Sequence, residues 1–254
     1  MSSAAALKPD YGNWVGKNNI YVPGVAGLVF LGLALLLPVL AVLAALCLLV
    51  AGYFAYARYR FSPRGGGVED RIRALVPARL EWDGRGQALD IGCGNGPLVI
   101  ALAQKYPGAR VTGIDYWGAQ WEYAQSACER NAQVAGVTQR VTFQKASAAS
   151  LPFADGTFDA VVSNLVFHEV NDARDKRALI REALRVLRKG GKFAFQDLFL
   201  IERVYGSPAE LLAEIRSWGI SRVELTRTRD EAFIPAALKL PFMVGTMAIL
   251  SGEK

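Results

Sequence analysis

The pattern of hydrophobic and polar positions divides the 254-residue chain into two unlike parts. From residue 22 to residue 57 no side chain is charged, and most of these 36 positions are apolar. After residue 68, short apolar runs alternate with stretches whose apolar positions have helical spacing, which is the pattern of alternating strands and helices. We therefore expect a helical membrane segment followed by an α/β domain with a doubly wound, mostly parallel sheet.

The α/β part supplies enough elements for a seven-stranded sheet. Strands are predicted at residues 87–91, 110–114, 141–145, 158–165 and 192–198, with a terminal antiparallel pair at 222–228 and 245–251. Helices are predicted at residues 69–80, 97–106, 121–135, 174–188 and 208–218. Ser207 precedes the last of these helices and is a candidate N-cap.

The uncharged run is much longer than the roughly 20 residues that cross a bilayer once. Pro38 lies near its middle and breaks or kinks a helix there. The run therefore forms either a helical hairpin, at 24–37 and 39–56, or one long, kinked, tilted span. Basic residues on both flanks favour the hairpin. The absence of a polar turn at the tip argues against two ordinary spans, so a re-entrant hairpin fits as well as a full one.

These features predict four segments. Residues 1–21 form a polar or interfacial segment, residues 22–57 the membrane element, residues 58–68 a linker rich in glycine, and residues 69–254 the α/β domain. A secretory signal peptide is disfavoured, because its apolar region is shorter, about 7–15 residues, and lies closer to the start.

The formal charge of +6 is concentrated beside the uncharged run. Residues 1–67 carry five basic and one acidic side chain, a net +4, which leaves +2 for the rest. This placement predicts that the protein binds a lipid bilayer and no nucleic acid, and it leaves the oligomeric state open. It also predicts that the α/β domain lies on the cytoplasmic side of the cell membrane. The three cysteines have no metal-binding spacing, which predicts no metal site and suits a reducing compartment.

The candidate chemistry is centred on a glycine-rich turn between the first strand and the next helix. Gly92, Gly94 and Gly96 alternate there with Cys93 and Asn95, and Asp90 precedes them. Glycine lets the backbone approach a ligand closely, and the following helix offers unpaired N–H groups. The third glycine comes one residue earlier than in the dinucleotide fingerprint. Cys93 is interpreted as a small residue that fits the turn.

Four motifs together resemble class I S-adenosylmethionine (SAM)-dependent methyltransferases, and most nearly the ubiquinone/menaquinone-biosynthesis (type 11) group. They are Leu89-Asp90-Ile91-Gly92-Cys93-Gly94-Asn95-Gly96, the strand ending in Ile114-Asp115, Leu151-Pro152-Phe153 before Phe158-Asp159-Ala160-Val161-Val162-Ser163-Asn164, and Leu187-Arg188-Lys189-Gly190-Gly191-Lys192. The resemblance covers about residues 69–254. It implies a Rossmann-like fold and SAM as cofactor.

The resemblance also implies cofactor contacts for particular residues. The three glycines, with Cys93 between them, approach the methionine part of SAM, and Asp90 holds the loop or the amino end of that part. Asp115 accepts hydrogen bonds from the ribose hydroxyls. Tyr116 and Trp117 pack on the adenine face, with packing in the core as the alternative. Relatives usually have an acidic residue just after the third strand, whereas this chain has Ser147, so Ser147 and the backbone of Ala148 are the candidates to meet the adenine amino group.

The catalytic candidates follow the fourth strand. Asn164 ends that strand beside the expected position of the sulfonium methyl. His168 is the only histidine in the chain, and its ordinary pKa near 6.5 suits proton removal from a methyl acceptor. Glu169 is a candidate to orient or replace it. A purely structural, hydrogen-bonded His168 remains the alternative.

The expected function is a membrane-anchored methyltransferase that transfers the methyl group of SAM to a lipid or other hydrophobic acceptor. Two alternatives stay open: methylation of a soluble small molecule or protein, with the anchor serving only location, and a non-catalytic SAM-binding module of a membrane complex. A Rossmann oxidoreductase is disfavoured by the glycine spacing.

Overall fold

The computed structural model describes residues 8–117 and 125–254 and divides the chain into two compact units. One unit is Gly12–Ile72. The other combines Met1–Tyr11 with Arg73–Lys254. Each unit is described here by itself.

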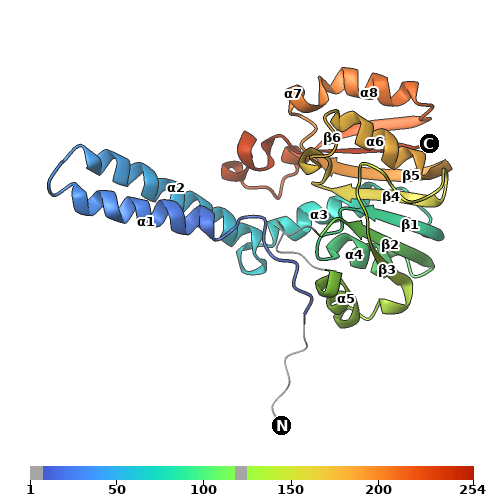
Figure 1. Ribbon diagram of the computed structural model, residues 1–254, viewed down its shortest axis with the longest axis horizontal. Coiled ribbons are helices and arrows are strands. Elements are labelled where there is room, and N and C mark those ends of the chain that lie inside the picture. Colours follow the sequence, from blue (N-terminus) through green and yellow to red (C-terminus); the bar gives the residue numbers. More distant parts are fainter. Residues whose placement is uncertain (1–7, 118–124) are drawn as a thin grey trace, which may run out of the picture. The chain divides into compact units, whose positions relative to one another are not determined.

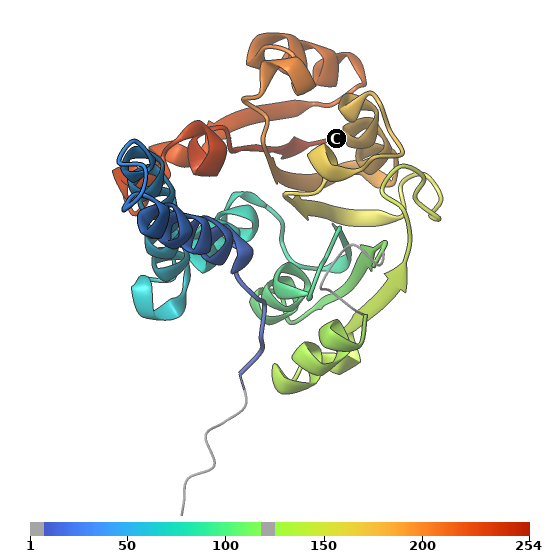
Figure 2. The same cartoon turned by 60° about the vertical axis from the view of Figure 1, so that its left-hand side comes forward.

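The smaller unit is a helical hairpin (Figure 1 and Figure 2). Helix α1 (Asn18–Leu33) and helix α2 (Leu40–Phe61) lie side by side, joined by residues 34–39 with Pro38 among them. A Cβ atom built on Gly27 would lie 2.8 Å from Leu48 Cγ, so the missing side chain allows this close approach. The expected hairpin is confirmed as a fold, and the single kinked span is wrong.

The hairpin extends beyond the expected limits at both ends. Helix α1 begins at Asn18, before the uncharged run, and includes Pro23. Helix α2 continues through Arg58 and Arg60 to Phe61, so the first residues of the predicted linker are helical. A short 3₁₀ turn at Pro63–Gly65 follows.

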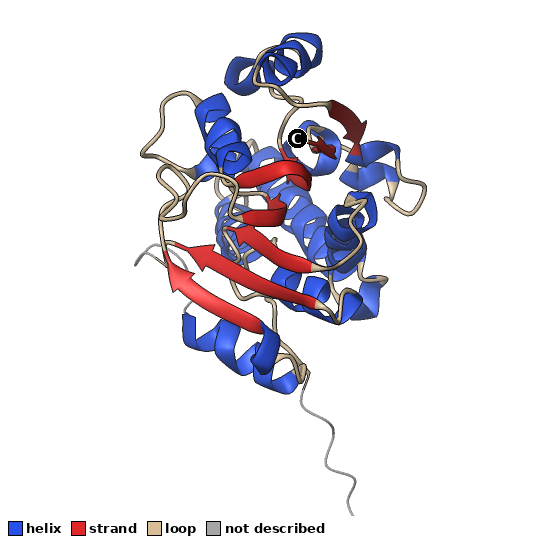
Figure 3. Cartoon of the chain, turned by 90° about the vertical axis from the view of Figure 1, so that its right-hand side faces the viewer, coloured by secondary structure: helices blue, strands red, loops and turns tan. Residues whose placement is uncertain are grey.

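The larger unit contains the seven-stranded sheet, in the order β3-β2-β1-β4-β5-β7-β6. The strands are β1 (Gly86–Ile91), β2 (Ala109–Asp115), β3 (Val141–Lys145), β4 (Phe158–Asn164), β5 (Leu187–Asp197), β6 (Arg222–Arg227) and β7 (Ala248–Glu253). The first five are parallel, and β7 runs antiparallel to both β5 and β6. Figure 3 shows the strands between their helices. The predicted doubly wound sheet with a terminal antiparallel pair is confirmed.

The remaining helices connect the strands. They are α3 (Val68–Arg79), α4 (Pro97–Lys105), α5 (Gln125–Val134), α6 (Lys176–Arg185), α7 (Glu202–Tyr205) and α8 (Pro208–Ser217). Ser207 caps α8 as expected, since its side chain accepts the Glu210 N–H while the Glu210 carboxylate accepts the Ser207 N–H. The predicted start of α5 at residue 121 lies outside the described residues.

Two predicted boundaries are wrong. The helix expected at 174–188 ends at Arg185, and β5 already begins at Leu187. Leu187 continues the apolar spacing of the helix, but it lies in β5 and pairs with Phe158 of β4. The register between these two strands then shifts before Ala160. The last strand begins at Ala248 rather than 245, because Pro241–Gly245 forms a helical turn.

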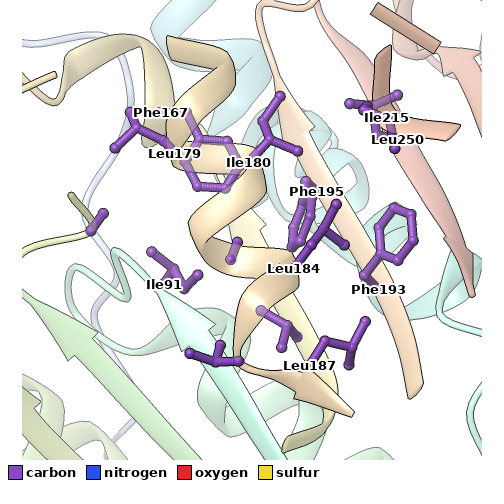
Figure 4. Packing of buried hydrophobic residues seen from close by; sticks show 14 of the residues in the cluster. Ile91, Phe167, Leu179, Ile180, Leu184, Leu187, Phe193, Phe195, Ile215 and Leu250 are labelled. Atoms are coloured by element: carbon purple, nitrogen blue, oxygen red, sulfur yellow. The ribbon is translucent and has the colours of Figure 1, made fainter. Parts of the chain in front are cut away.

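A hydrophobic cluster between α6 and the sheet positions the segment after β4. Figure 4 shows Phe167, Leu179, Leu184 and Phe195 packed there, and all of them are buried. The rings of Phe167 and Phe195 meet edge to face with centroids 5.4 Å apart. Phe167 therefore anchors the turn that carries His168.

The hairpin can be tested by a crosslink between its helices. A Cβ atom on Gly24 would lie 3.8 Å from Ala51 Cβ, which is a normal separation for a disulfide. In a Cys47→Ala background, Gly24→Cys with Ala51→Cys should form an intramolecular disulfide, detected by mass spectrometry after proteolysis. The matched pair Gly32→Cys with Ala51→Cys should not, because a Cβ on Gly32 meets nothing within 4 Å. Equal crosslinking of the two pairs would contradict the hairpin.

Candidate functional site

The candidate residues gather at the carboxyl edge of the parallel strands. Strand β1 lies between β2 and β4, so the connections leaving β1 and β4 run to opposite sides. This reversal is where open α/β sheets bind ligands. The glycine-rich loop follows β1, Asp115 ends β2, Asn164 ends β4 and Asp197 ends β5.

The glycine loop needs glycine for steric reasons. Gly92, Gly94 and Gly96 all have positive φ, at 72°, 54° and 82°. A Cβ on Gly92 would lie 2.2 Å from Val166 Cγ2, which is impossible without displacing the segment after β4. The N–H groups of Gly92 and Cys93 both donate to Ile114 O, at 2.8 and 2.9 Å, and this ties the loop to β2.

Gly94 is held by side chains from two elements. Its N–H donates to Asp115 Oδ2 at 2.9 Å. Its carbonyl accepts from Trp117 Nε1 at 3.1 Å and from the Cys128 thiol of α5 at 2.8 Å. Asp115 thus holds the loop, and its second oxygen accepts the Trp117 N–H at 2.9 Å. A carboxylate has about four acceptor positions, so two remain for the predicted ribose contact.

Two residues at this edge have strained backbones. Trp117 and Leu165 have φ of 40° and 59°, and they are the non-glycine residues with positive φ in the described part of the chain. Leu165 directly follows Asn164 at the end of β4, and Trp117 lies two residues after Asp115 at the end of β2. Such strain persists where surrounding contacts fix it, as the hydrogen bond from Leu165 N to Gln196 O at 2.7 Å does here.

Asp90 provides a test of whether a cofactor fits. It is 1% exposed, and among the described residues neither of its carboxylate oxygens accepts a hydrogen bond of normal geometry. Burial, together with the nearby Asp115, raises the pKa of Asp90 well above its usual range, although the backbone N–H of Val99 acts in the opposite direction. The side-chain oxygens of Asn95 and Asn164 are also buried without a described partner. A ligand that carries an ammonium group and hydroxyls would supply the missing donors, and the residues present therefore fit SAM.

The remaining predicted cofactor residues occupy varied positions. Tyr116 is 60% exposed, with Lys145 Nζ 5.2 Å from its ring centre, and its adenine contact stays a prediction. The Ser147 hydroxyl already accepts the Ala149 N–H at 3.2 Å, and Ala148 is buried in the core, so their adenine contact stays a prediction too. Burial and the hydrogen bond with Cys128 raise the pKa of the Cys93 thiol, which fits its interpretation as a packing residue.

His168 is paired with a buried carboxylate that the sequence analysis did not single out. Its Nδ1 lies 2.6 Å from Asp197 Oδ1. Asp197 is fully buried and also accepts the N–H groups of Val166, Phe167 and Leu198, at 3.1, 2.8 and 2.6 Å. Because Asp197 can only accept, Nδ1 must donate, which leaves the other ring nitrogen, Nε2, as the basic atom.

The electrostatics of His168 suit a general base. Burial lowers the pKa of His168, but the hydrogen bond and the charge of Asp197 outweigh it, so the pKa is raised above 6.5. Glu169 Oε1 lies 3.7 Å from Nε2, and burial raises the pKa of Glu169. Asn164 ends β4, and His168 and Glu169 lie in the connection that follows it, as expected; their catalytic roles stay predictions.

Asp197 was missed from the sequence alone, and Trp117 was assigned there only to the adenine face or to the core. Asp197 has the same sequence signal as Asp115, a single acidic residue that ends an apolar strand. This signal could have identified Asp197. The hydrogen bond of the Trp117 indole to Gly94 could not be predicted, since it joins positions 23 residues apart.

Comparisons with known proteins agree with this geometry. The family described as a methyltransferase domain matches residues 89–195. The 27-O-demethylrifamycin SV methyltransferase of Amycolatopsis mediterranei is 37% identical over 145 residues, which cover 57% of this chain and 47% of the relative. The ubiquinone/menaquinone biosynthesis C-methyltransferase of Desulfotalea psychrophila is 35% identical over 131 residues, 52% of this chain and 49% of the relative. The chain thus spans about half the length of these curated relatives.

Solved structures support the fold. A geranyl diphosphate methyltransferase in complex with SAM superposes with a TM-score of 0.56 at 17% identity, over 78% of this chain and 89% of that one. The cyclase SpnF gives a TM-score of 0.54 at 24% identity, over 73% and 80%. A fold shared with a cyclase does not by itself decide the chemistry. The family match over residues 89–195 and the site geometry together support a SAM-dependent methyltransferase domain in this chain.

Asp90→Asn should separate stability from cofactor affinity. Because burial raises the folded pKa of Asp90 above its unfolded value, ionised Asp90 costs stability at neutral pH. The variant should therefore melt at a higher temperature without ligand at pH 7, with the gain vanishing below about pH 4, where the carboxyl is protonated in both states. Its dissociation constant for S-adenosylhomocysteine, measured by calorimetry, should rise at least about tenfold, or about 1.4 kcal/mol. Unchanged affinity would contradict the role assigned to Asp90.

Proposed function

We propose that this protein is a membrane-anchored methyltransferase that transfers the methyl group of SAM to a lipid or other hydrophobic acceptor. The proposed anchor is the α1–α2 hairpin, and the proposed base is His168, oriented by Asp197. The observation that carries the membrane part is the hairpin tip, which is apolar and exposed. Leu35 and Leu36 at this tip are 89% and 79% exposed.

The tip suits hydrocarbon better than water. Residues 33–39 contain no polar side chain, and the exposed leucines form a contiguous apolar surface, which soluble proteins rarely present to water. From residue 34 to residue 42, every N–H group except that of Val39 is hydrogen-bonded within the hairpin, and Pro38 carries no N–H. A backbone satisfied to this extent suits a bilayer, where no water is available as a partner.

The lengths of the two helices suit a hairpin that enters the bilayer and returns to the same side. Helices of 16 and 22 residues are about 24 and 33 Å long, against a hydrocarbon core of about 30 Å. Among the described helices, α2 alone is long and apolar enough to cross a membrane by itself. Lys17 precedes α1, and Arg58 and Arg60 end α2, so the basic residues gather at the open end. Under the positive-inside rule, this charge distribution supports our proposal that the domain lies on the cytoplasmic side.

The proposed chemistry needs few catalytic groups. SAM, when bound, supplies a methyl group already activated by the positive charge on sulfur. The residues of this chain then position the acceptor, exclude water and take up a proton. We assign the proton to Nε2 of His168, with Asp197 holding the ring and stabilising the imidazolium. An acceptor with an ionisable O–H, such as a phenol, fits this base, and its oxygen bonds to the methyl carbon as the carbon–sulfur bond breaks.

The relatives are compatible with such an acceptor without identifying it. Their names include O-methyltransferases from Aspergillus species as well as the C-methyltransferase described above. A non-catalytic SAM-binding module would have no need of the His168–Asp197 pair. Methylation of a soluble molecule remains the rival function, and the experiment below separates it from the proposed one.

Methyl-labelled SAM tests the proposal directly. Membranes containing the full-length protein should incorporate label into material that partitions into organic solvent, and membranes containing His168→Gln should not. Leu36→Asp should lower this incorporation and the binding to vesicles, because a charge in hydrocarbon costs about 2.5–3.5 kcal/mol. Tyr59→Asp, at the open end of the hairpin between two arginines, is the matched control and should change little. Label found instead in water-soluble molecules, unaffected by Leu36→Asp, would support the rival function.

The pH dependence tests the base. His168 must be neutral to accept a proton, so kcat/KM should rise with pH, with a midpoint above 6.5, since Asp197 raises the pKa. Asp197→Asn should shift that midpoint to lower pH, because burial then dominates, and it should also slow the reaction. If the pH profile of kcat/KM were unchanged in both His168→Gln and Asp197→Asn, His168 would not be the base.

A further inference from the structure

The segment that precedes the hairpin is attached to the cofactor side of the larger unit. Asp10 pairs with Asn131 of α5 through its backbone: Asp10 N–H donates to Asn131 Oδ1 at 3.0 Å, and Asn131 Nδ2 donates to Asp10 O at 2.8 Å. The next residue, Tyr11, packs against the hydrophobic cluster that contains Cys93 and Cys128. The Arg73 guanidinium lies 5.9 Å from the centre of the Tyr11 ring.

Asn131 also contacts the glycine-rich loop. Its Nδ2 donates a second hydrogen bond, at 3.0 Å, to the carbonyl of Asn95, between Gly94 and Gly96. Asn131 is 3% exposed, so this amide is shielded from water, and both of its N–H hydrogens are used.

Helix α5 therefore fixes two consecutive carbonyls of the loop. Cys128 binds the carbonyl of Gly94, and Asn131, three residues later on the same helix face, binds that of Asn95. With these carbonyls turned toward α5, the loop is held in one conformation.

We infer that Asn131 is a positioning residue for SAM, and that residues 8–11 form a strap whose attachment and cofactor binding stabilise each other. One side chain joins the strap to the loop, so any ligand that steadies the loop steadies the strap equally, by thermodynamic reciprocity. The inference concerns cofactor binding alone and does not depend on a membrane or on the acceptor.

The side-chain half of the inference predicts a loss of affinity. Asn131→Leu keeps the volume but leaves the carbonyls of Asn95 and Asp10 without their partner, an expensive change in a buried place. The dissociation constant for S-adenosylhomocysteine and the KM for SAM should rise at least about fivefold, with kcat at saturating SAM retained. Gln133→Leu, at an exposed position of the same helix, is the matched control and should bind normally.

The strap half is tested without altering Asn131. Asp10→Pro and Asp10→Ala both remove the carboxylate, but only proline removes the N–H that donates to Asn131. Asp10→Pro should therefore weaken S-adenosylhomocysteine binding at least about threefold relative to Asp10→Ala, a size expected for such coupling between neighbouring groups. Asp10 itself is exposed, so this pair of variants remains informative if Asn131→Leu does not fold.

Hydrogen exchange distinguishes coupling between the strap and the cofactor from a purely structural role of Asn131. In the full-length protein, S-adenosylhomocysteine should slow deuterium uptake at the Asp10 amide, and Asn131→Leu should abolish this effect. The inference is overturned if the ligand leaves Asp10 exchange unchanged in the unaltered protein, or if Asn131→Leu and Gln133→Leu bind the ligand equally. Because these measurements use binding only, loss of methyl transfer with normal coupling would count against the proposed function and not against the strap.

Discussion

The hydrogen bonds around Gly94 are the constraint on which the rest of the site depends. Its N–H is held by Asp115 and its carbonyl by Trp117 and Cys128, so both polar groups of one backbone unit are fixed by three separate side chains. Gly92 can take its conformation only without a side chain, because Val166 occupies the adjacent space. The loop is thus shaped before any ligand arrives, which reduces the ordering that binding must impose.

This arrangement leaves unsatisfied groups where a ligand is expected. Asp90 is buried with neither oxygen accepting a hydrogen bond of normal geometry from the described residues, and the strained backbones of Trp117 and Leu165 lie at the same edge of the sheet. A fold selected only for stability would avoid all three features. In contrast, Asp197 is buried with four donors around it, one of them Nδ1 of His168. The two buried aspartates therefore differ: Asp197 is satisfied by this chain, whereas Asp90 is left for the proposed ligand.

Much of the fold was predictable because its signals are local. Apolar runs located the strands, and the glycine loop and Asp115 marked the ends of β1 and β2. The helix after β4 was predicted too long, since Leu187 has the spacing of a helical position and only its pairing with Phe158 shows it to be in a strand. Basic residues on both flanks favoured the hairpin over a long span, and only the structure shows that Gly24 and Gly27 face Ala51 and Leu48 across the two helices. Asp197 and Asn131 were missed because their partners are distant in the sequence, at His168 and at Asp10 and Asn95.

The central claim is that this preformed loop, with Asp90 beneath it and Asp115 at the end of the next strand, binds SAM. Titration calorimetry on the full-length protein in detergent, with S-adenosylhomocysteine and with NAD, tests it most directly. The account predicts saturable, one-to-one binding of S-adenosylhomocysteine and no heat from NAD. Binding of NAD without binding of S-adenosylhomocysteine would contradict it.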